Sequence, residues 1–213
     1  MIRVYLVDDL ELVRAGIRSM LDGEEDIVVI GEFGSGEAVV QACRDCLADL
    51  ILMDVNMPGI GGIEATRRIV QAHPTVRVIA VTVLEDDPFP HQLLDAGATG
   101  YISKAGDRDE MLEGIRTVMK GDRFIAGDVA KKLTLANIQN QGESSPLGKL
   151  TPREMQVMMM VIQGHGNQAI SDTLFLSPKT VYTYRARVFE KLNVANDVEL
   201  THFGFRHGLI DRV

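Results

Sequence analysis

Four short apolar runs in the first half of the chain each stop at one or two polar residues. The runs are residues 2–7, 50–53, 76–81 and 100–103. The polar residues that follow them are Asp8, Asp9, Asp54, Thr82 and Lys104. Continuous apolar runs are typical of strands that are buried on both faces of a parallel sheet. Because open α/β sheets place their ligands at the carboxyl ends of the strands, we expect these five side chains to meet at one sheet edge.

Strand and helix patterns alternate five times through residues 1–123. We expect strands at residues 2–7, 27–31, 49–53, 76–81 and 100–103. We expect helices at about residues 10–22, 35–46, 63–72, 88–96 and 107–120. Five such units are too few for an eight-stranded barrel and predict an α/β doubly wound (flavodoxin-like) sheet. Residues 124–140 show the pattern of one further helix, and residues 139–146 have the composition of a flexible linker.

The charge of the chain is unevenly distributed. The 213 residues carry a net charge of −8. Residues 1–123 contain 12 Lys and Arg against 22 Asp and Glu, whereas residues 150–213 contain 7 against 6. Within residues 177–192, Glu190 is the single acid among four bases, which are Lys179, Arg185, Arg187 and Lys191. A basic segment that follows an acidic domain indicates nucleic-acid binding.

The hydropathy of the chain argues against a membrane protein. No apolar stretch approaches the roughly 18 residues that suggest a membrane-spanning helix. The first apolar run stops at Asp8, too early for a signal peptide. We therefore expect a soluble cytoplasmic protein with no membrane partner.

The two cysteines, Cys43 and Cys46, form a C-x-x-C pair. A redox-active pair of this kind lies at a helix N-terminus, where the helix dipole stabilises the thiolate. This pair closes a predicted helix instead, and the sequence has no second pair to complete a zinc site. We expect neither redox nor metal chemistry from it.

The polar residues at the strand ends have the chemistry of a phosphoryl-accepting site. Clustered carboxylates repel one another unless a cation lies among them, and their hard oxygen ligands suit Mg²⁺. We expect Asp8, Asp9 and Asp54 to hold it. A carboxylate can also attack phosphorus, while the Lys104 ammonium neutralises charge and Thr82 offers a hydroxyl.

Some of these residues also fit simpler structural roles. A single aspartate at a strand end is commonly a helix cap, and Tyr101 is equally suited to the core. The glycines of residues 59–62 fail the dinucleotide-binding pattern, because Glu64 occupies its last glycine position. They are better explained as a turn after Asp54.

Residues 1–122 resemble the receiver domain of two-component response regulators. The resemblance implies that Asp54 accepts a phosphoryl group from a sensor histidine kinase. It also implies that the Asn56 backbone carbonyl is a further Mg²⁺ ligand and that Thr82, Tyr101 and Lys104 sense the phosphoryl group. The sequence departs from the usual pattern at Leu10, often His, and at Ala105, often Pro.

Two other functions fit the same fold. An aspartyl-phosphate hydrolase has a second acid two residues after its nucleophile, where this chain has Asn56. A flavodoxin-like electron carrier needs a phosphate-binding loop after the first strand, where this chain has Asp8 and Asp9. We therefore expect neither, and no catalytic residues of an enzyme.

The last part of the chain carries the signals of a helix-turn-helix. Thr151 and Glu154 form a capping box around Pro152. A short helix at residues 167–174 and a tight link then lead to a helix at residues 178–192, which Ser177 caps. The methionines at 158–160 are better explained by core packing than by a cofactor.

The helix at 178–192 has two faces. Its apolar stripe, which packs on the domain, is Val181, Tyr184, Val188 and Leu192. The opposite face has Lys179, Thr183, Ala186 and Arg187, with Tyr182 at its edge. The helix N-terminus with Lys179 and Thr180 suits a phosphate, and side chains of the outer face, such as the Thr183 hydroxyl, can touch base edges.

Residues 149–208 resemble the output domain of the NarL/FixJ (LuxR-type) family in LTPRE, LSPKTV and EKL. The resemblance places Tyr182, Thr183 and Ala186 at base-reading positions and makes Lys179, Arg185, Arg187 and Lys191 phosphate contacts. The chain then divides into a receiver (1–122), a linker with a helix (123–148) and an all-α helix-turn-helix domain (149–213). The last helix, which begins near Asn196, resembles the dimer-forming helix of the family.

The resemblance implies a transcription factor. A homodimer that forms on activation would bind double-stranded promoter DNA. Segments such as MPGIGGIEATR and DVELTHFGFRHG resemble a subgroup that is phosphorylated by hybrid sensor kinases and activates genes for small regulatory RNAs.

Overall fold

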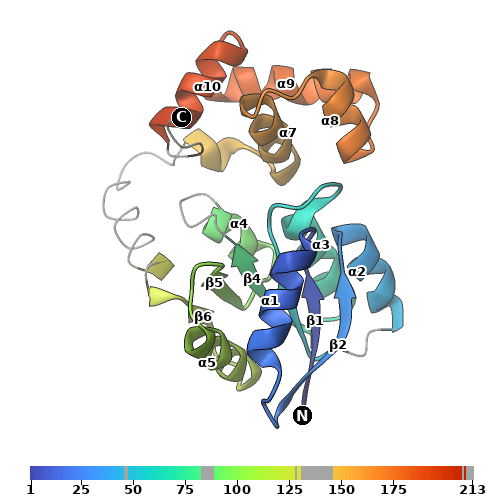
Figure 1. Cartoon of the computed structure of the whole chain (residues 1–213). Helices are drawn as coiled ribbons and strands as arrows, with labels where there is room; N and C mark the ends of the chain where they lie inside the picture. The colour runs from blue at the N-terminus through green and yellow to red at the C-terminus, as the bar shows by residue number, and fades with distance from the viewer. Residues whose placement is uncertain (46–47, 83–88, 128, 131–145, 208, 210–213) are drawn as a thin grey trace. The chain divides into compact units, whose positions relative to one another are not determined.

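The computed structural model describes residues 1–45, 48–82, 89–127, 129–130, 146–207 and 209. The chain divides into two compact units, Met1–Gln139 and Asn140–Val213 (Figure 1). Each unit has its own core. No helix of the described residues is long and apolar enough to span a membrane.

The first unit is built on a parallel sheet with the order β2-β1-β3-β4-β5-β6. The strands are β1 (Ile2–Val7), β2 (Ile27–Phe33), β3 (Leu50–Met53), β4 (Arg77–Thr82), β5 (Gly100–Ser103) and β6 (Phe124–Ile125). The central strands β3, β4 and β5 are buried along almost their whole length, as their continuous apolar runs require. The predicted doubly wound α/β class is confirmed.

Helices cover both faces of this sheet. They are α1 (Glu11–Leu21), α2 (Gly36–Ala42), α3 (Gly61–Ala72), α4 (Phe89–Asp95) and α5 (Arg108–Met119). One core contains Leu50 and Leu52 with residues of α1 and α5. The other contains Ile51 and Met53 with residues of α2 and α3. Successive side chains of a strand point to opposite faces, so one short run of β3 contributes to both cores.

The sixth strand was missed by the sequence prediction, which expected only helix after residue 123. β6 pairs with β5 at Gly100 and Phe124 and at Tyr101 and Ile125. Its two residues are too few to show an alternating pattern, and neighbouring β5 decides their conformation. Most of the predicted helix at 124–140 lies outside the described residues, as does the predicted linker at 139–146 except for its last residue.

Cys43 is buried in a short 3-10 helix (Cys43–Asp45) that continues α2. Its position after the helix agrees with the expected distance from the positive end of the dipole. Cys46 lies outside the described residues.

The second unit is helical. After a short 3-10 helix (Pro146–Lys149) come α7 (Pro152–Ile162), α8 (Asn167–Leu174), α9 (Pro178–Leu192) and α10 (Asp197–Arg206). Met158 and Met159 are buried, which agrees with a packing role for them. The expected caps are present, because Thr151 and Glu154 form the capping box and Ser177 accepts from the Thr180 N–H. Phe175 ends α8 in the left-handed conformation (φ 52°), which makes the tight turn of the helix-turn-helix.

Candidate functional site

The carboxyl ends of β1 and β3 lie side by side, which brings Asp8 next to Asp54. Val7 is paired with Met53 across the two strands. The Asp54 backbone N–H donates to the Val7 carbonyl at 2.7 Å. At the next pair of strands, the Lys104 N–H donates to the Thr82 carbonyl at 2.9 Å. The residues predicted at the strand ends therefore gather at one sheet edge.

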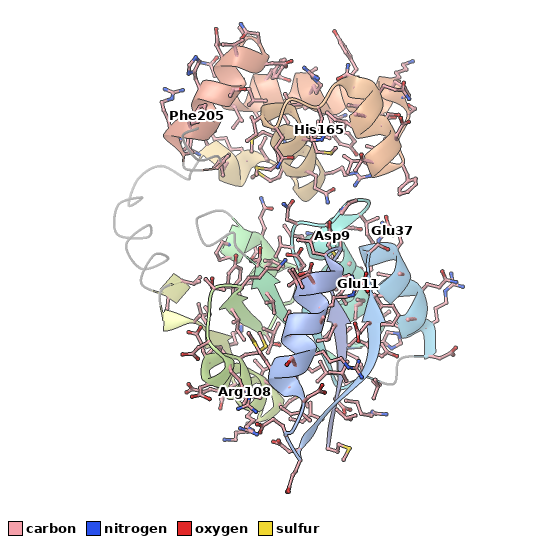
Figure 2. All side chains as sticks on the ribbon, viewed as in Figure 1. Asp9, Glu11, Glu37, Arg108, His165 and Phe205 are labelled. Atoms are coloured by element: carbon pink, nitrogen blue, oxygen red, sulfur yellow. The ribbon has the colours of Figure 1, made fainter. Side chains whose placement is uncertain are left out.

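Lys104 joins the two buried aspartates. Its Nζ lies 2.5 Å from Asp8 Oδ2 and 3.1 Å from Asp54 Oδ2. The side chains of Asp8 and Asp54 are only 2% and 3% exposed, whereas Asp9 is exposed. Figure 2 shows Asp9 at the end of the unit where α1 begins. The cluster is thus reachable from solvent on the Asp9 side.

The charges of the cluster are not balanced. One carboxylate oxygen from each of Asp8, Asp9 and Asp54 lies within 4.8 Å of the others. Lys104 compensates part of the three negative charges. Burial raises the pKa of Asp54, and the charge of Asp8 raises it further, although Lys104 acts in the opposite direction. Three oxygen donors with excess negative charge fit a divalent cation such as Mg²⁺.

The pKa of Lys104 is raised. Burial alone would lower it, but hydrogen bonds and charge interactions with Asp8 and Asp54 outweigh that effect. The ammonium is therefore a permanent positive charge at the site at neutral pH.

Three other residues predicted for the site are Asn56, Thr82 and Tyr101. Asn56 is exposed, and its backbone N–H donates to Asp54 Oδ1 at 3.3 Å. Thr82 and Tyr101 have no exposed surface. The described conformation holds Tyr101 as a core aromatic on β5.

Neither Asp8 nor Asp54 caps a helix. The N-cap of α1 is Leu10, which has no side-chain cap, and Asp8 Oδ1 accepts from the Leu10 N–H at 2.9 Å within the loop. The structural role of helix cap therefore does not explain Asp8 and Asp54.

The turn after Asp54 needs its glycines. Gly59 and Gly61 have φ angles of 78° and 68°. A Cβ on Gly62 would lie 1.9 Å from the Asp54 carbonyl oxygen. The turn therefore brings the start of α3 directly onto the backbone of Asp54, as expected for residues 59–62.

Two residues that hold the loops of the site were missed by the sequence analysis. Arg14 Nη1 donates to the Asp8 carbonyl at 2.7 Å. Glu37 Oε1 accepts from the Ile60 N–H at 2.7 Å, from the first turn of α2 (Figure 2). Both are charged residues on helices, and charged helix residues are usually exposed to solvent. Nothing in the sequence therefore predicts that Arg14 and Glu37 bind loop backbone.

The second unit presents an outward face on α9. Val181, Val188 and Leu192 are buried and Tyr184 is half-buried. The opposite face is exposed, and its residues are Lys179, Tyr182, Thr183, Ala186 and Arg187. A shallow open hollow of about 280 Å³ lies on this helix, lined by Lys179, Thr180, Thr183, Tyr184 and Arg187.

Two of the basic residues of α9 are directed into their own domain. Arg185 donates to Asn167 Oδ1 at 2.7 Å and is paired with Asp197, so it joins α9 to the starts of α8 and α10. Lys191 donates to Glu154 Oε2 at 2.6 Å and to the Lys149 carbonyl at 3.0 Å. These contacts give Arg185 and Lys191 structural partners, whereas Lys179 and Arg187 form no ion pair with the part of the chain that the structure describes.

Comparison with known proteins places both units. Residues 4–116 match the response regulator receiver domain, and residues 148–203 match the luxR family of bacterial regulatory proteins. The chain is 48% identical to the response regulator GacA of Pseudomonas viridiflava over 211 residues, 99% of each chain. It is 48% identical to the response regulator UvrY of Escherichia coli K12 over 98% of this chain and 96% of UvrY.

This chain belongs to the response regulators with a LuxR-type DNA-binding domain. The predicted resemblance to this family is confirmed, and the chain is similar to GacA and UvrY over nearly its full length. Among solved structures, RcsB of Salmonella enterica serovar Typhimurium bound to the promoter rprA with the phosphomimetic BeF₃⁻ has a TM-score of 0.68 and 25% identity. That match covers 95% of this chain and 98% of RcsB.

Membership of this family argues against the two alternative functions, an aspartyl-phosphate hydrolase and a flavodoxin-like electron carrier. The response regulators it resembles are transcriptional regulators and not enzymes. Receiver domains bind Mg²⁺ at an acidic pocket, and this response regulator has a cluster of three acids, Asp8, Asp9 and Asp54, at the corresponding sheet edge.

Proposed function

We propose that Asp54 of this response regulator accepts a phosphoryl group from a sensor histidine kinase, and that the phosphorylated chain dimerises and binds promoter DNA. The observation that carries the proposal is the Lys104 ammonium, which bridges two buried aspartates at a solvent-accessible sheet edge. An acceptor, an acidic metal pocket and a fixed cation are the parts that phosphoryl transfer needs.

Asp54 is a better nucleophile than Asp8. Asp8 Oδ1 accepts a 2.9 Å hydrogen bond from Leu10, and its Oδ2 is 2.5 Å from Lys104. The corresponding contacts of Asp54 are longer, at 3.3 Å to Asn56 and 3.1 Å to Lys104. The contacts that must break before Asp54 attacks phosphorus are therefore weaker than those of Asp8.

The transfer step is a displacement at phosphorus. An Asp54 carboxylate oxygen forms a bond to the phosphorus of a phosphohistidine, the nitrogen–phosphorus bond breaks, and the imidazole leaves with the electron pair. Asp8, Asp9, Asp54 and the Asn56 carbonyl would hold Mg²⁺, which supplies positive charge for the phosphoryl oxygens. Lys104 lies close enough to Asp54 to pair with a phosphoryl oxygen there.

The response to phosphorylation would pass through β4 and β5. Thr82 is the last residue of β4. Tyr101 lies on β5, three residues before Lys104. When Lys104 turns to the phosphoryl group it leaves Asp8. We propose that Thr82 and Tyr101 then adjust with it as the switch residues.

DNA is proposed to bind on the exposed face of α9. Lys179 and Arg187 would contact phosphates together with Thr180 at the helix N-terminus, and Tyr182, Thr183 and Ala186 would face the bases. Arg185 and Lys191, predicted as phosphate contacts, are better assigned to the domain itself because of their internal partners. RcsB, which resembles this chain, is described as dimers bound to DNA.

The similarity to GacA and UvrY supports a finer proposal. The kinase would be a hybrid sensor kinase, and the target promoters would be those of small regulatory RNA genes. A regulator of promoters works in the cytoplasm, where the bacterial chromosome lies.

Phosphorylation is tested by mass spectrometry of the full-length protein after incubation with Mg²⁺ and acetyl phosphate. One phosphoryl mass is expected on the wild type and on the control Asp22→Asn, and none on Asp54→Asn. Omission of Mg²⁺ should stop labelling. Equal labelling of Asp54→Asn would refute the assignment of the acceptor.

A further inference from the structure

The threonine hydroxyls on the DNA-facing side of α9 are already used within the protein. Thr183 Oγ1 donates to the Lys179 carbonyl at 3.0 Å. Thr180 Oγ1 shares a hydrogen bond with Ser177 Oγ at 2.7 Å. A hydroxyl has one proton to donate, so Thr183 has none left for a base. The expected contact between the Thr183 hydroxyl and a base edge is thereby limited to one in which the Thr183 oxygen accepts.

Thr183 still presents its methyl group to an incoming surface, together with a hydroxyl oxygen that can only accept a hydrogen bond. Ala186, three residues later, is exposed and offers a second methyl group. Tyr182 is 67% exposed and adds an aromatic ring four residues before Ala186. Residues three and four apart are neighbours on a helix surface. We call Tyr182, Thr183 and Ala186 the methyl face of α9.

The position of the methyl face matches the base-reading part of a recognition helix. Lys179 and Arg187 lie on the same exposed side, one turn before Thr183 and one turn after it. Their charges suit phosphates, which hold the helix in register without reading sequence. If Lys179 and Arg187 contact phosphates, the exposed residues between them would face the floor of the groove.

In the major groove, the thymine C5-methyl group is the apolar feature that distinguishes one base pair from another. An amide or guanidinium would instead read the hydrogen-bonding edges of adenine or guanine. We propose that the methyl face reads thymine methyl groups by apolar contact, so that target promoters carry thymine at the contacted positions. This proposal rests on the proposed DNA-binding function.

The first test alters the DNA by one methyl group. Duplexes are selected from a random library by the full-length phosphorylated protein, and each thymine is then replaced by deoxyuridine. Deoxyuridine keeps the pairing and hydrogen-bonding groups and lacks the C5-methyl. At contacted positions we expect about fourfold weaker binding per methyl, and no change elsewhere.

The second test alters the protein by a matched pair. Thr183→Val keeps the methyl and replaces the hydroxyl, whereas Thr183→Ser keeps the hydroxyl and removes the methyl. We expect Thr183→Val to retain the preference for thymine over deoxyuridine and Thr183→Ser to lose it at one position. Lys179→Met serves as the control, because it should weaken binding to both duplexes by the same factor.

Three results would count against these assignments in different ways. If no sequence is enriched in the selection, the proposed sequence-specific DNA binding is wrong. If sequences are enriched and deoxyuridine costs nothing at any position, the methyl reading alone is wrong. If Thr183→Val loses discrimination and Thr183→Ser keeps it, the hydroxyl reads the base and the methyl reading of Thr183 is overturned.

Discussion

The ammonium of Lys191 lies 2.6 Å from the buried carboxylate of Glu154, and this contact joins the end of α9 to the first turn of α7. Glu154 is only 2% exposed and also accepts from the Thr151 N–H at 2.8 Å. One carboxylate therefore closes the capping box and anchors α9, the helix proposed to face DNA.

Lys191→Met should destabilise the DNA-binding unit without weakening a phosphate contact. The substitution keeps the aliphatic stem and leaves Glu154 without its cation, at a cost of about 2 kcal/mol. Lys179→Met, on the exposed side, should leave the free energy of unfolding within about 0.5 kcal/mol and weaken DNA binding. Denaturant unfolding and DNA titration of both variants check this. The opposite pattern would return Lys191 to the DNA contacts.

The same contact predicts acid sensitivity. Burial alone would raise the pKa of Glu154, but Lys191 and Thr151 outweigh it, and the pKa lies below its usual value. A lowered pKa in the folded state contributes stability above the ordinary glutamate pKa, and this stability is lost as the pH falls below about 4. Circular dichroism at acidic pH should show that Lys191→Met loses less stability on acidification than the wild type.

Gly62→Ala should abolish a folded acceptor site. Its Cβ would overlap the Asp54 carbonyl oxygen, which is backbone and cannot turn away. We expect a loss of about 3 kcal/mol or more and loss of labelling. Gly16→Ala in α1 is the matched control, because a Cβ there meets nothing within 4 Å and should add about 0.5–1 kcal/mol. Thermal unfolding that is equal for the two variants would contradict the described turn.

Asp54→Asn should stabilise the Mg²⁺-free protein. Burial raises the pKa of Asp54, so its charged form becomes a liability as the pH rises above the ordinary aspartate value. The neutral amide removes that cost, and we expect Tm at pH 7 to rise by roughly 3–5 °C. Added Mg²⁺ should raise the Tm of the wild type more than that of the variant. A lower Tm of Asp54→Asn without Mg²⁺ would show that pairing with Lys104 outweighs the repulsion.

The gathering of the acidic cluster could be predicted because its geometry follows from strand ends. A parallel sheet places the carboxyl ends of neighbouring strands at one edge, so the position of Asp54 after a buried run was sufficient. The same was true of the α9 faces, because helical periodicity fixes which Cβ atoms point inward.

The contacts that could not be predicted from the sequence are made by long side chains or join segments that are far apart in the sequence. Periodicity placed Lys191 and Arg185 on α9, but it does not show where their flexible ends find Glu154 or Asp197. The hydroxyl of Thr183 has two possible partners, a base and its own helix, and only the folded helix shows the bond to Lys179. Glu37 holds the backbone of Ile60, which is 23 residues away in the sequence.

The short strand β6 connects the acceptor side of the sheet with the segment that follows α5. The Ala126 N–H donates to the Tyr101 carbonyl at 2.9 Å, and the Phe124 N–H donates to the Thr99 carbonyl at 3.2 Å. The main chain that follows α5 is thereby fastened to the strand that carries Tyr101 and leads to Lys104. These two backbone bonds join β5 directly to the main chain after α5, so a displacement of β5 would move that segment as well.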